Sequence, residues 1–285
     1  MKKDNALKLS YPSKKATVCP ACEEKFHKEE LLSGSGRLIA GGLTEELHRL
    51  YEPSVKYGDV YPLAYQAAVC PNCWFAAMNE DFSLLPDEQR DIVSMKEAER
   101  KAELELIFPQ LDFHEPRDLF SGAASQYLIM RCYDYYPKQF SPTAKQGLAA
   151  LRASWMFDEM DKKEPGQHYD WLAMLFKRKA RFFYSQALAN EGTGTEALSG
   201  LKAFGPDTDK NYGYEGFLYI TGLLEFKYGE RENEEQWKER IASTKRTIAK
   251  MFGLGKSSKN KPGPLLEKAR NLYDEIAKEL EDTDD

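Results

Sequence analysis

Three absences in the 285-residue sequence exclude whole classes of protein. No run approaches the ~18 apolar residues of a membrane-spanning helix, so we do not expect an integral membrane protein. Glycine and proline, with 19 and 14 residues, are neither abundant nor periodic, which excludes collagen-like and low-complexity chains. Residues 1–5 are charged and no apolar run follows them. We therefore expect no secretory signal and a cytoplasmic protein.

The composition is nevertheless that of a folded protein. Hydrophobic residues make up 42% of the chain and aromatic residues 12%, which is more than a disordered chain contains. The formal net charge is −6, and the excess of negative charge falls after residue 75. A negatively charged body repels phosphate backbones, so nucleic acid is not the expected partner.

Cysteine is scarce, but four of the five cysteines form two matching patterns, Cys19-Pro20-Ala21-Cys22 and Cys70-Pro71-Asn72-Cys73. Two residues between cysteines form a tight turn, and proline at the second position fixes its φ angle. Thiolates at such turns converge on one tetrahedral ion at about 2.3 Å. A reducing compartment favours metal over disulfides. We therefore predict a structural Zn²⁺ site with four ligands: Cys19, Cys22, Cys70 and Cys73.

Other interpretations of these residues remain open. Four thiolates also hold iron–sulfur clusters, and a Cys-x-x-Cys motif at a strand-to-helix junction is typical of a redox pair. His27 follows Cys22 by five residues and is an alternative for one sulfur ligand. The fifth cysteine, Cys132, lies in an apolar segment, where we expect a buried, inert thiol.

The segment around the two turns predicts a small β module. β-prone runs at residues 16–18 and 65–69 precede the turns, as in a zinc ribbon. The long insert between the turns contains several glycines but lacks the Gly-Lys-Ser/Thr ending of a phosphate-binding loop. We expect the insert to be flexible and turn-rich, with a short helix at residues 44–50. Residues 1–85 are therefore predicted to be a zinc-ribbon-like module that depends on its metal for folding.

After the second turn the sequence shows the apolar periodicity of long helices. We predict helices at residues 86–108, 118–135, 142–161, 168–190, 214–228, 234–252 and 264–281, and a shorter one before Gly205. The buried stripe expected in the first helix consists of Ile92, Met95, Ala102 and Leu106. The basic segment 256–263 is expected to be a mobile connection.

The spacing of small and aromatic residues suggests paired helices. In the second helix of a tetratricopeptide repeat, alanine is followed by an aromatic residue four positions later and by alanine three positions after that. Two helices contain the pattern fully or in part: Ala180, Tyr184 and Ala187 in one, and Ala269, Tyr273 and Ile276 in the other. The predicted fold class is mainly α, with the β module followed by an irregular tetratricopeptide-like helical array over residues 86–285. An orthogonal helical bundle is the alternative.

Taken together, these motifs resemble the bacterial Domain of Unknown Function 2225 family. The resemblance rests on both Cys-Pro-x-Cys turns, on residues 57–65 before the second turn, and on residues 218–225 and the final helix. The resemblance covers most of the chain and implies architecture alone, because the family has no assigned activity. The family usually has Gly-Tyr after the last cysteine, whereas this chain has Trp74-Phe75, and Glu23 follows the first pair.

We find no catalytic constellation in the sequence. His114 and His168 have no serine or cysteine partner marked by spacing, and Trp155, Trp171 and Trp237 are expected to be packing anchors. The resulting prediction is a non-enzymatic, zinc-stabilised scaffold that binds a protein partner in a groove of its helical domain. No small-molecule substrate is indicated.

Two other hypotheses are kept. A zinc-ribbon nucleic-acid binder would use basic residues near the turns: Lys14, Lys15, Lys25, Lys28, Arg37 and Arg49. A metal-dependent enzyme would need an open coordination position, which four thiolates do not leave. Loss of folding together with the metal would distinguish a structural site from a catalytic one.

Overall fold

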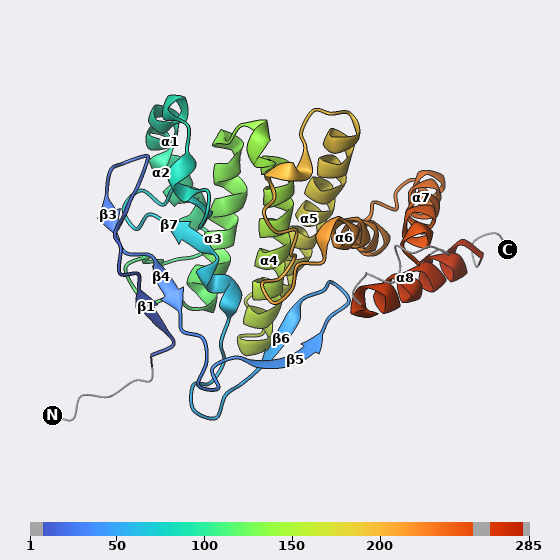
Figure 1. Ribbon diagram of the computed structural model, residues 1–285, viewed down its shortest axis with the longest axis horizontal. Helices are drawn as coiled ribbons and strands as arrows, with labels where there is room; N and C mark the ends of the chain where they lie inside the picture. The colour runs from blue at the N-terminus through green and yellow to red at the C-terminus, as the bar shows by residue number, and fades with distance from the viewer. Residues whose placement is uncertain (1–7, 253–262, 282–285) are drawn as a thin grey trace.

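A computed structural model describes residues 8–252 and 263–281 of the chain. These residues form a small N-terminal β region followed by eight α-helices (Figure 1). The prediction of a mainly α fold with a small β module before the helices is confirmed. The connection predicted at residues 256–263 lies, except for Gly263, outside the described residues. Within the described ranges, no helix combines the length and the apolar character needed to cross a bilayer.

The β region consists of short antiparallel strand pairs. They are β1 (Ser10–Pro12) with β4 (Glu29–Leu31), β2 (Thr17–Val18) with β3 (Lys25–Phe26), β5 (Ile39–Leu43) with β6 (Arg49–Glu52), and β7 (Ala67–Val69) with β8 (Ala76–Met78). The β2–β3 and β7–β8 hairpins each carry one Cys-Pro-x-Cys turn, so the strands predicted before both turns are confirmed. Because two-stranded sheets are marginally stable in water, this region needs another source of stability.

The helices follow the β region in chain order. They are α1 (Arg90–Met95), α2 (Glu97–Glu105), α3 (Leu119–Cys132), α4 (Pro142–Lys163), α5 (Tyr169–Gly192), α6 (Gly213–Tyr228), α7 (Glu234–Phe252) and α8 (Gly263–Glu281). Helices α3 to α8 confirm the corresponding predictions, and the short helix before Gly205 is a 3-10 turn, η6 (Leu198–Gly200). Helix α4 packs between α3 and α5, and the three stand side by side in Figure 1.

The single helix predicted at residues 86–108 is interrupted. The backbone leaves helical geometry at Lys96, where ψ is 9°, and this separates α1 from α2. The predicted buried stripe is wrong, because all four of its members are exposed: Ile92, Met95, Ala102 and Leu106. The side chains that face inward are Val93, Arg100 and Leu104. The predicted stripe assumes one continuous helix, and the interruption at Lys96 breaks that continuity. The polar contacts of Arg100 determine which side of α2 faces the interior.

The insert does not form the helix predicted at residues 44–50. The N–H of Leu47 donates to the carbonyl of Thr44 at 3.1 Å, Leu47 has a φ of 60°, and β6 starts at Arg49. The Leu47 side chain is fully buried and lies close to Gly216 of α6. Figure 1 shows the β5–β6 hairpin extending from the β region below α4 towards α8. Burial of the hairpin tip thus outweighs the local helix propensity.

Helices α4 and α5 approach each other closely. Ala180, Tyr184 and Ala187 of α5 are buried, as the alanine–aromatic spacing predicts. A Cβ added at Gly147 of α4 would lie 2.9 Å from Cδ2 of Tyr184, so only glycine fits there. This pair is consistent with tetratricopeptide-like packing, while the repeat architecture itself stays a prediction.

A buried ion pair joins the β region to the helices. Asp81, which follows β8, pairs with Lys145 of α4, and both side chains are buried. The Tyr133 hydroxyl donates to Asp81 Oδ2 at 2.6 Å and accepts from the N–H of Met78 at 3.3 Å. These contacts cross the predicted boundary between residues 85 and 86, and the boundary stays a prediction.

We expect Lys145→Met to lower the free energy of unfolding by about 3–5 kcal/mol, because Asp81 would keep an uncompensated buried charge. The double variant Asp81→Asn/Lys145→Met should be more stable than Lys145→Met, since asparagine is neutral and still accepts from Tyr133. Urea denaturation followed by circular dichroism measures both. A Lys145→Met protein as stable as the native chain would contradict the role of this pair.

Candidate metal centre

The two Cys-Pro-x-Cys turns have the same backbone geometry. In the first turn, the N–H of Cys19 donates to the carbonyl of Glu24 at 2.8 Å. In the second turn, the N–H of Cys70 donates to the carbonyl of Phe75 at 2.9 Å. Each bond closes the hairpin directly beside the first cysteine, so both sulfurs of a turn project from the same tip.

The residue after each second cysteine has a left-handed backbone. Glu23 has a φ of 63° and Trp74 a φ of 56°. Their N–H groups donate to the carbonyls of Cys19 and Cys70, both at 3.0 Å. A residue other than glycine pays about 1–2 kcal/mol for this conformation. The absence of glycine therefore does not prevent the turns from forming, and other interactions must offset the strain.

The structure brings the four predicted ligands together. The Sγ atoms of Cys19 and Cys73 lie 3.6 Å apart, those of Cys22 and Cys70 lie 3.5 Å apart, and all four lie within 4.8 Å of one another. A disulfide would require about 2.0 Å. A tetrahedron with metal–sulfur distances of about 2.3 Å has edges of about 3.8 Å. The cluster therefore has the dimensions needed to hold a single metal ion.

His27 is not part of this cluster. Its Nδ1 lies 2.6 Å from the carbonyl oxygen of Ser13 on the neighbouring strand. The alternative in which His27 replaces a sulfur ligand therefore receives no support from the geometry.

The four thiols influence one another's protonation. Hydrogen bonds from Cys19 and Cys73 lower the pKa of the Cys70 thiol, whereas the interaction with Cys70 raises the pKa of Cys19. The pKa of Cys73 is raised by the interaction with Cys19 and then with Cys70. Because negative charges this close repel, the thiols cannot all ionise without a cation. A metal ion would displace their protons, so its affinity should fall as the pH decreases.

Helices α1 and α2 hold both turns in place. The Ser94 hydroxyl of α1 donates to the carbonyl of Ala21 at 2.7 Å. The buried Arg100 of α2 donates to the carbonyl of Cys73 from Nη2 at 2.5 Å and from Nε at 3.2 Å. Its Nη1 donates to the carbonyl of Val93 at 3.1 Å. The guanidinium thus anchors the backbone of the second turn at its last cysteine.

The cluster is largely enclosed by protein. Cys19, Cys70 and Cys73 are buried, and Cys22 is partly exposed. The side-chain amide of Asn72 donates to Cys22 Sγ at 3.6 Å and covers the exposed sulfur. Four protein ligands fill a tetrahedral shell, which is typical of structural metal sites.

Comparisons with known proteins identify the family of this chain. The model of a family described as "Uncharacterized protein conserved in bacteria (DUF2225)" matches residues 13–276. The chain belongs to this family. An uncharacterized protein from Borreliella burgdorferi (strain ATCC 35210 / DSM 4680 / CIP 102532 / B31) is 42% identical over 273 residues, which cover 96% of this chain and 98% of that protein. No solved structure matches the chain.

In this DUF2225 protein, the fifth cysteine lies outside the four-sulfur cluster. Cys132 is fully buried, as predicted, and burial raises the pKa of its thiol; the inertness of this thiol stays a prediction. Arg49, one of the six basic residues of the nucleic-acid hypothesis, pairs with Asp209 at 2.9 Å. Arg37 lies over the ring of Tyr57. These two side chains are engaged within the chain, and nucleic-acid binding stays a hypothesis without a marked surface.

The structure corrects one packing assignment. Trp155 and Trp237 are buried, as predicted, but Trp171 is exposed on α5. Tryptophan is usually a packing anchor because of its large apolar area. Helix α5 has apolar residues on two faces, and sequence periodicity alone does not tell which face is buried. The prediction therefore placed Trp171 on the wrong face.

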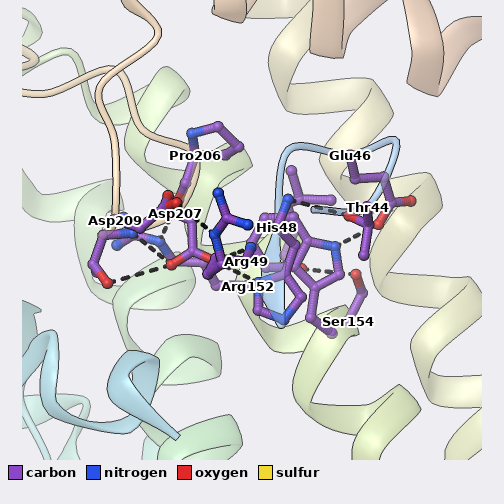
Figure 2. Close-up of polar contacts among 12 residues, drawn as sticks. Thr44, Glu46, His48, Arg49, Arg152, Ser154, Pro206, Asp207 and Asp209 are labelled. Carbon is purple, nitrogen blue, oxygen red and sulfur yellow. Dashed lines mark hydrogen bonds and ion pairs between the residues drawn. The ribbon is translucent and has the colours of Figure 1, made fainter. Parts of the chain in front are cut away.

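The sequence also did not reveal a histidine–carboxylate pair between the hairpin and the helical body (Figure 2). Nδ1 of His48 donates to Oδ2 of Asp207 at 2.5 Å. The N–H of Arg49 donates to the same oxygen at 2.8 Å, and Trp155 stacks on the imidazole with ring centroids 4.2 Å apart. No motif links residues so far apart in the chain, so no sequence signal could have identified the pair.

We expect Cys70→Ser to lower the metal content from about one ion per chain and to unfold the β region, because metal coordination provides on the order of 10 kcal/mol in small metal-binding modules. Elemental analysis and limited proteolysis measure the two effects. Cys132→Ala is the matched control, since Cys132 lies outside the cluster; it should keep the metal. Full metal content in Cys70→Ser would contradict the assignment of this ligand.

A second substitution tests the strain in the turns. Glu23→Gly should raise the free energy of unfolding by about 0.5–1 kcal/mol, because glycine adopts a positive φ without a steric penalty. Glu24→Gly is the control, since Glu24 is also exposed but lacks a positive φ; it should destabilise the protein. Thermal unfolding of the metal-loaded variants measures the difference, and equal effects of the two substitutions would contradict the analysis.

Proposed function

We propose that this protein is a non-enzymatic scaffold that is stabilised by a structural Zn²⁺ ion and binds a protein partner through its helical domain. The zinc ligands in this proposal are Cys19, Cys22, Cys70 and Cys73. Tetrahedral coordination by four sulfurs is a preferred environment of zinc. A cytoplasmic location is part of the proposal, because reducing conditions keep the thiols available for metal.

The observation that carries partner binding is an apolar stripe on α5. Trp171, Met174 and Phe182 lie on one side of this helix, and 61%, 43% and 55% of their respective surfaces are exposed. Soluble proteins rarely leave large apolar side chains grouped on a rigid surface unless the surface binds something. Tryptophan in particular dominates the binding energy of many protein interfaces.

Charge on the same face suggests the chemistry of the partner. Arg178 is exposed between Met174 and Phe182 along the helix. Its neighbours Lys177 and Arg181 are engaged with acidic residues of adjacent helices, which leaves Arg178 at the front of the stripe. An amphipathic segment with apolar and acidic side chains would complement this surface. We therefore place the partner on the exposed face of α5 rather than in the groove that the sequence predicts.

The hairpin supports this placement. The β5–β6 tip covers part of the helical body through Leu47 and through the hydrogen bond from the Tyr219 hydroxyl to the carbonyl of Glu45 at 2.9 Å. The stripe on α5 makes no such contact and remains accessible. The metal-stabilised region would then hold the helices in a fixed arrangement while α5 presents the binding surface.

The double substitution Trp171→Ala/Phe182→Ala should reduce partner recovery by at least about tenfold, because hot-spot side chains contribute about 2 kcal/mol or more each. Affinity capture from native lysate with quantitative mass spectrometry identifies proteins lost from the double variant but kept by the native chain. Leu106→Ala is the matched control, because Leu106 is 87% exposed on the segment after α2. Identical protein profiles for the native chain and the double variant would contradict the proposed surface.

A further inference from the structure

A cavity of about 180 Å³ lies where the hairpin meets the helical body. Its walls come from β6, from residues 60–63 before β7 and from α4, and its lining is mainly apolar and aromatic: Leu50, Tyr51, Val60, Leu63, Trp155 and Met156. An apolar cavity of about 150 Å³ is large enough to bind benzene. The volume here therefore suits a ligand with a single six-membered ring.

One polar side chain in the lining is held in a fixed orientation. The imidazole of His48 stacks on Trp155 with an interplanar angle of 10°, and its Nδ1 donates to Asp207 (Figure 2). Because the carboxylate of Asp207 only accepts, Nδ1 of His48 carries a proton, and Nε2 is the ring nitrogen left to bind a ligand: it accepts in the neutral ring and donates in the charged ring. Within the described part of the chain, Nε2 has no hydrogen-bond partner. The cavity thus contains an oriented ring nitrogen that no protein group satisfies.

The surroundings of Asp207 maintain this orientation. Burial alone would raise the pKa of Asp207, but the hydrogen bond from His48, the positive charge of a protonated His48 and the N–H groups of Thr208 and Arg49 together outweigh burial and lower it. The ionised carboxylate accepts from Arg49 at 2.8 Å and from Thr208 at 2.5 Å. It can therefore only accept from His48, which fixes the proton on Nδ1.

We propose that this cavity binds a small single-ring aromatic ligand whose hydroxyl group forms a hydrogen bond with Nε2 of His48. The apolar walls would remove the ring of the ligand from water, and the stacked His48 and Trp155 would form one side of the site. The His48 side chain is 16% exposed, so a ligand without a polar group would displace water from Nε2 and provide no hydrogen bond in its place, which disfavours binding. This site is independent of the partner surface on α5, and it opens a second, small-molecule function for the chain.

Ligand binding would also strengthen the docking of the hairpin. The lining combines residues of β6 with residues of α4, so an occupied cavity adds contacts to both sides of the junction. A ligand that binds only the docked form raises the melting temperature with increasing concentration.

Phenol and toluene test the proposal, because they have nearly the same shape and differ in one hydrogen-bond donor. Calorimetric titration of the full metal-loaded chain should show phenol binding about tenfold more tightly than toluene. The nitrogen NMR signal of His48 Nε2 should shift with phenol alone. Equal affinities would overturn recognition of the hydroxyl by Nε2 of His48, and no binding of either probe at millimolar concentration would overturn the site.

Three variants show where phenol binds. His48→Phe keeps an aromatic ring on Trp155 but lacks Nε2, so it should lose the preference for phenol. His114→Phe is the control, since His114 is exposed and lies outside this cavity; it should keep the preference. If His48→Phe fails to fold, Val60→Trp fills the cavity from another wall and should abolish binding of both probes. Unchanged phenol binding in Val60→Trp would place the ligand elsewhere and overturn the proposal.

Discussion

The convergence of four cysteine sulfurs from two distant hairpins is the constraint on which the N-terminal β region of this structure depends. The strands around them are two to five residues long and form only isolated pairs. Such sheets bury too little surface to be stable alone. A shared metal ion would join the β2–β3 and β7–β8 hairpins and so fix both ends of the long insert. The insert can then form a defined hairpin and reach the helices.

The hairpin links this region to the helical body by combining apolar burial with directed polar contacts. Leu47 is buried at the tip, while Glu46 accepts from the Tyr228 hydroxyl at 3.2 Å and also pairs with the indole N–H of Trp155. Apolar contact provides most of the stabilisation, and the polar contacts select one position of the tip. The same junction creates the cavity beside His48. One docking interaction therefore joins the β region to the helical body and forms the candidate ligand site.

Features set by local pattern were predictable from the sequence, and features set by tertiary contacts were not. The cysteine spacing identified the four clustered sulfurs, and apolar periodicity identified the helices from α3 to α8. The inward face of α2 could not be predicted, because it depends on the interruption at Lys96 and on carbonyl acceptors for Arg100. Residues 44–50 have the composition of a helix but adopt a turn, since Leu47 is buried only after the hairpin docks.

Zinc K-edge X-ray absorption of the purified full-length protein tests the central claim most directly, because it reports both the metal and its nearest atoms. The account predicts about one zinc ion per chain with four sulfur neighbours at about 2.3 Å and no oxygen or nitrogen neighbour. A mixed shell that includes oxygen or nitrogen, or a fully folded protein that contains no zinc, would contradict it.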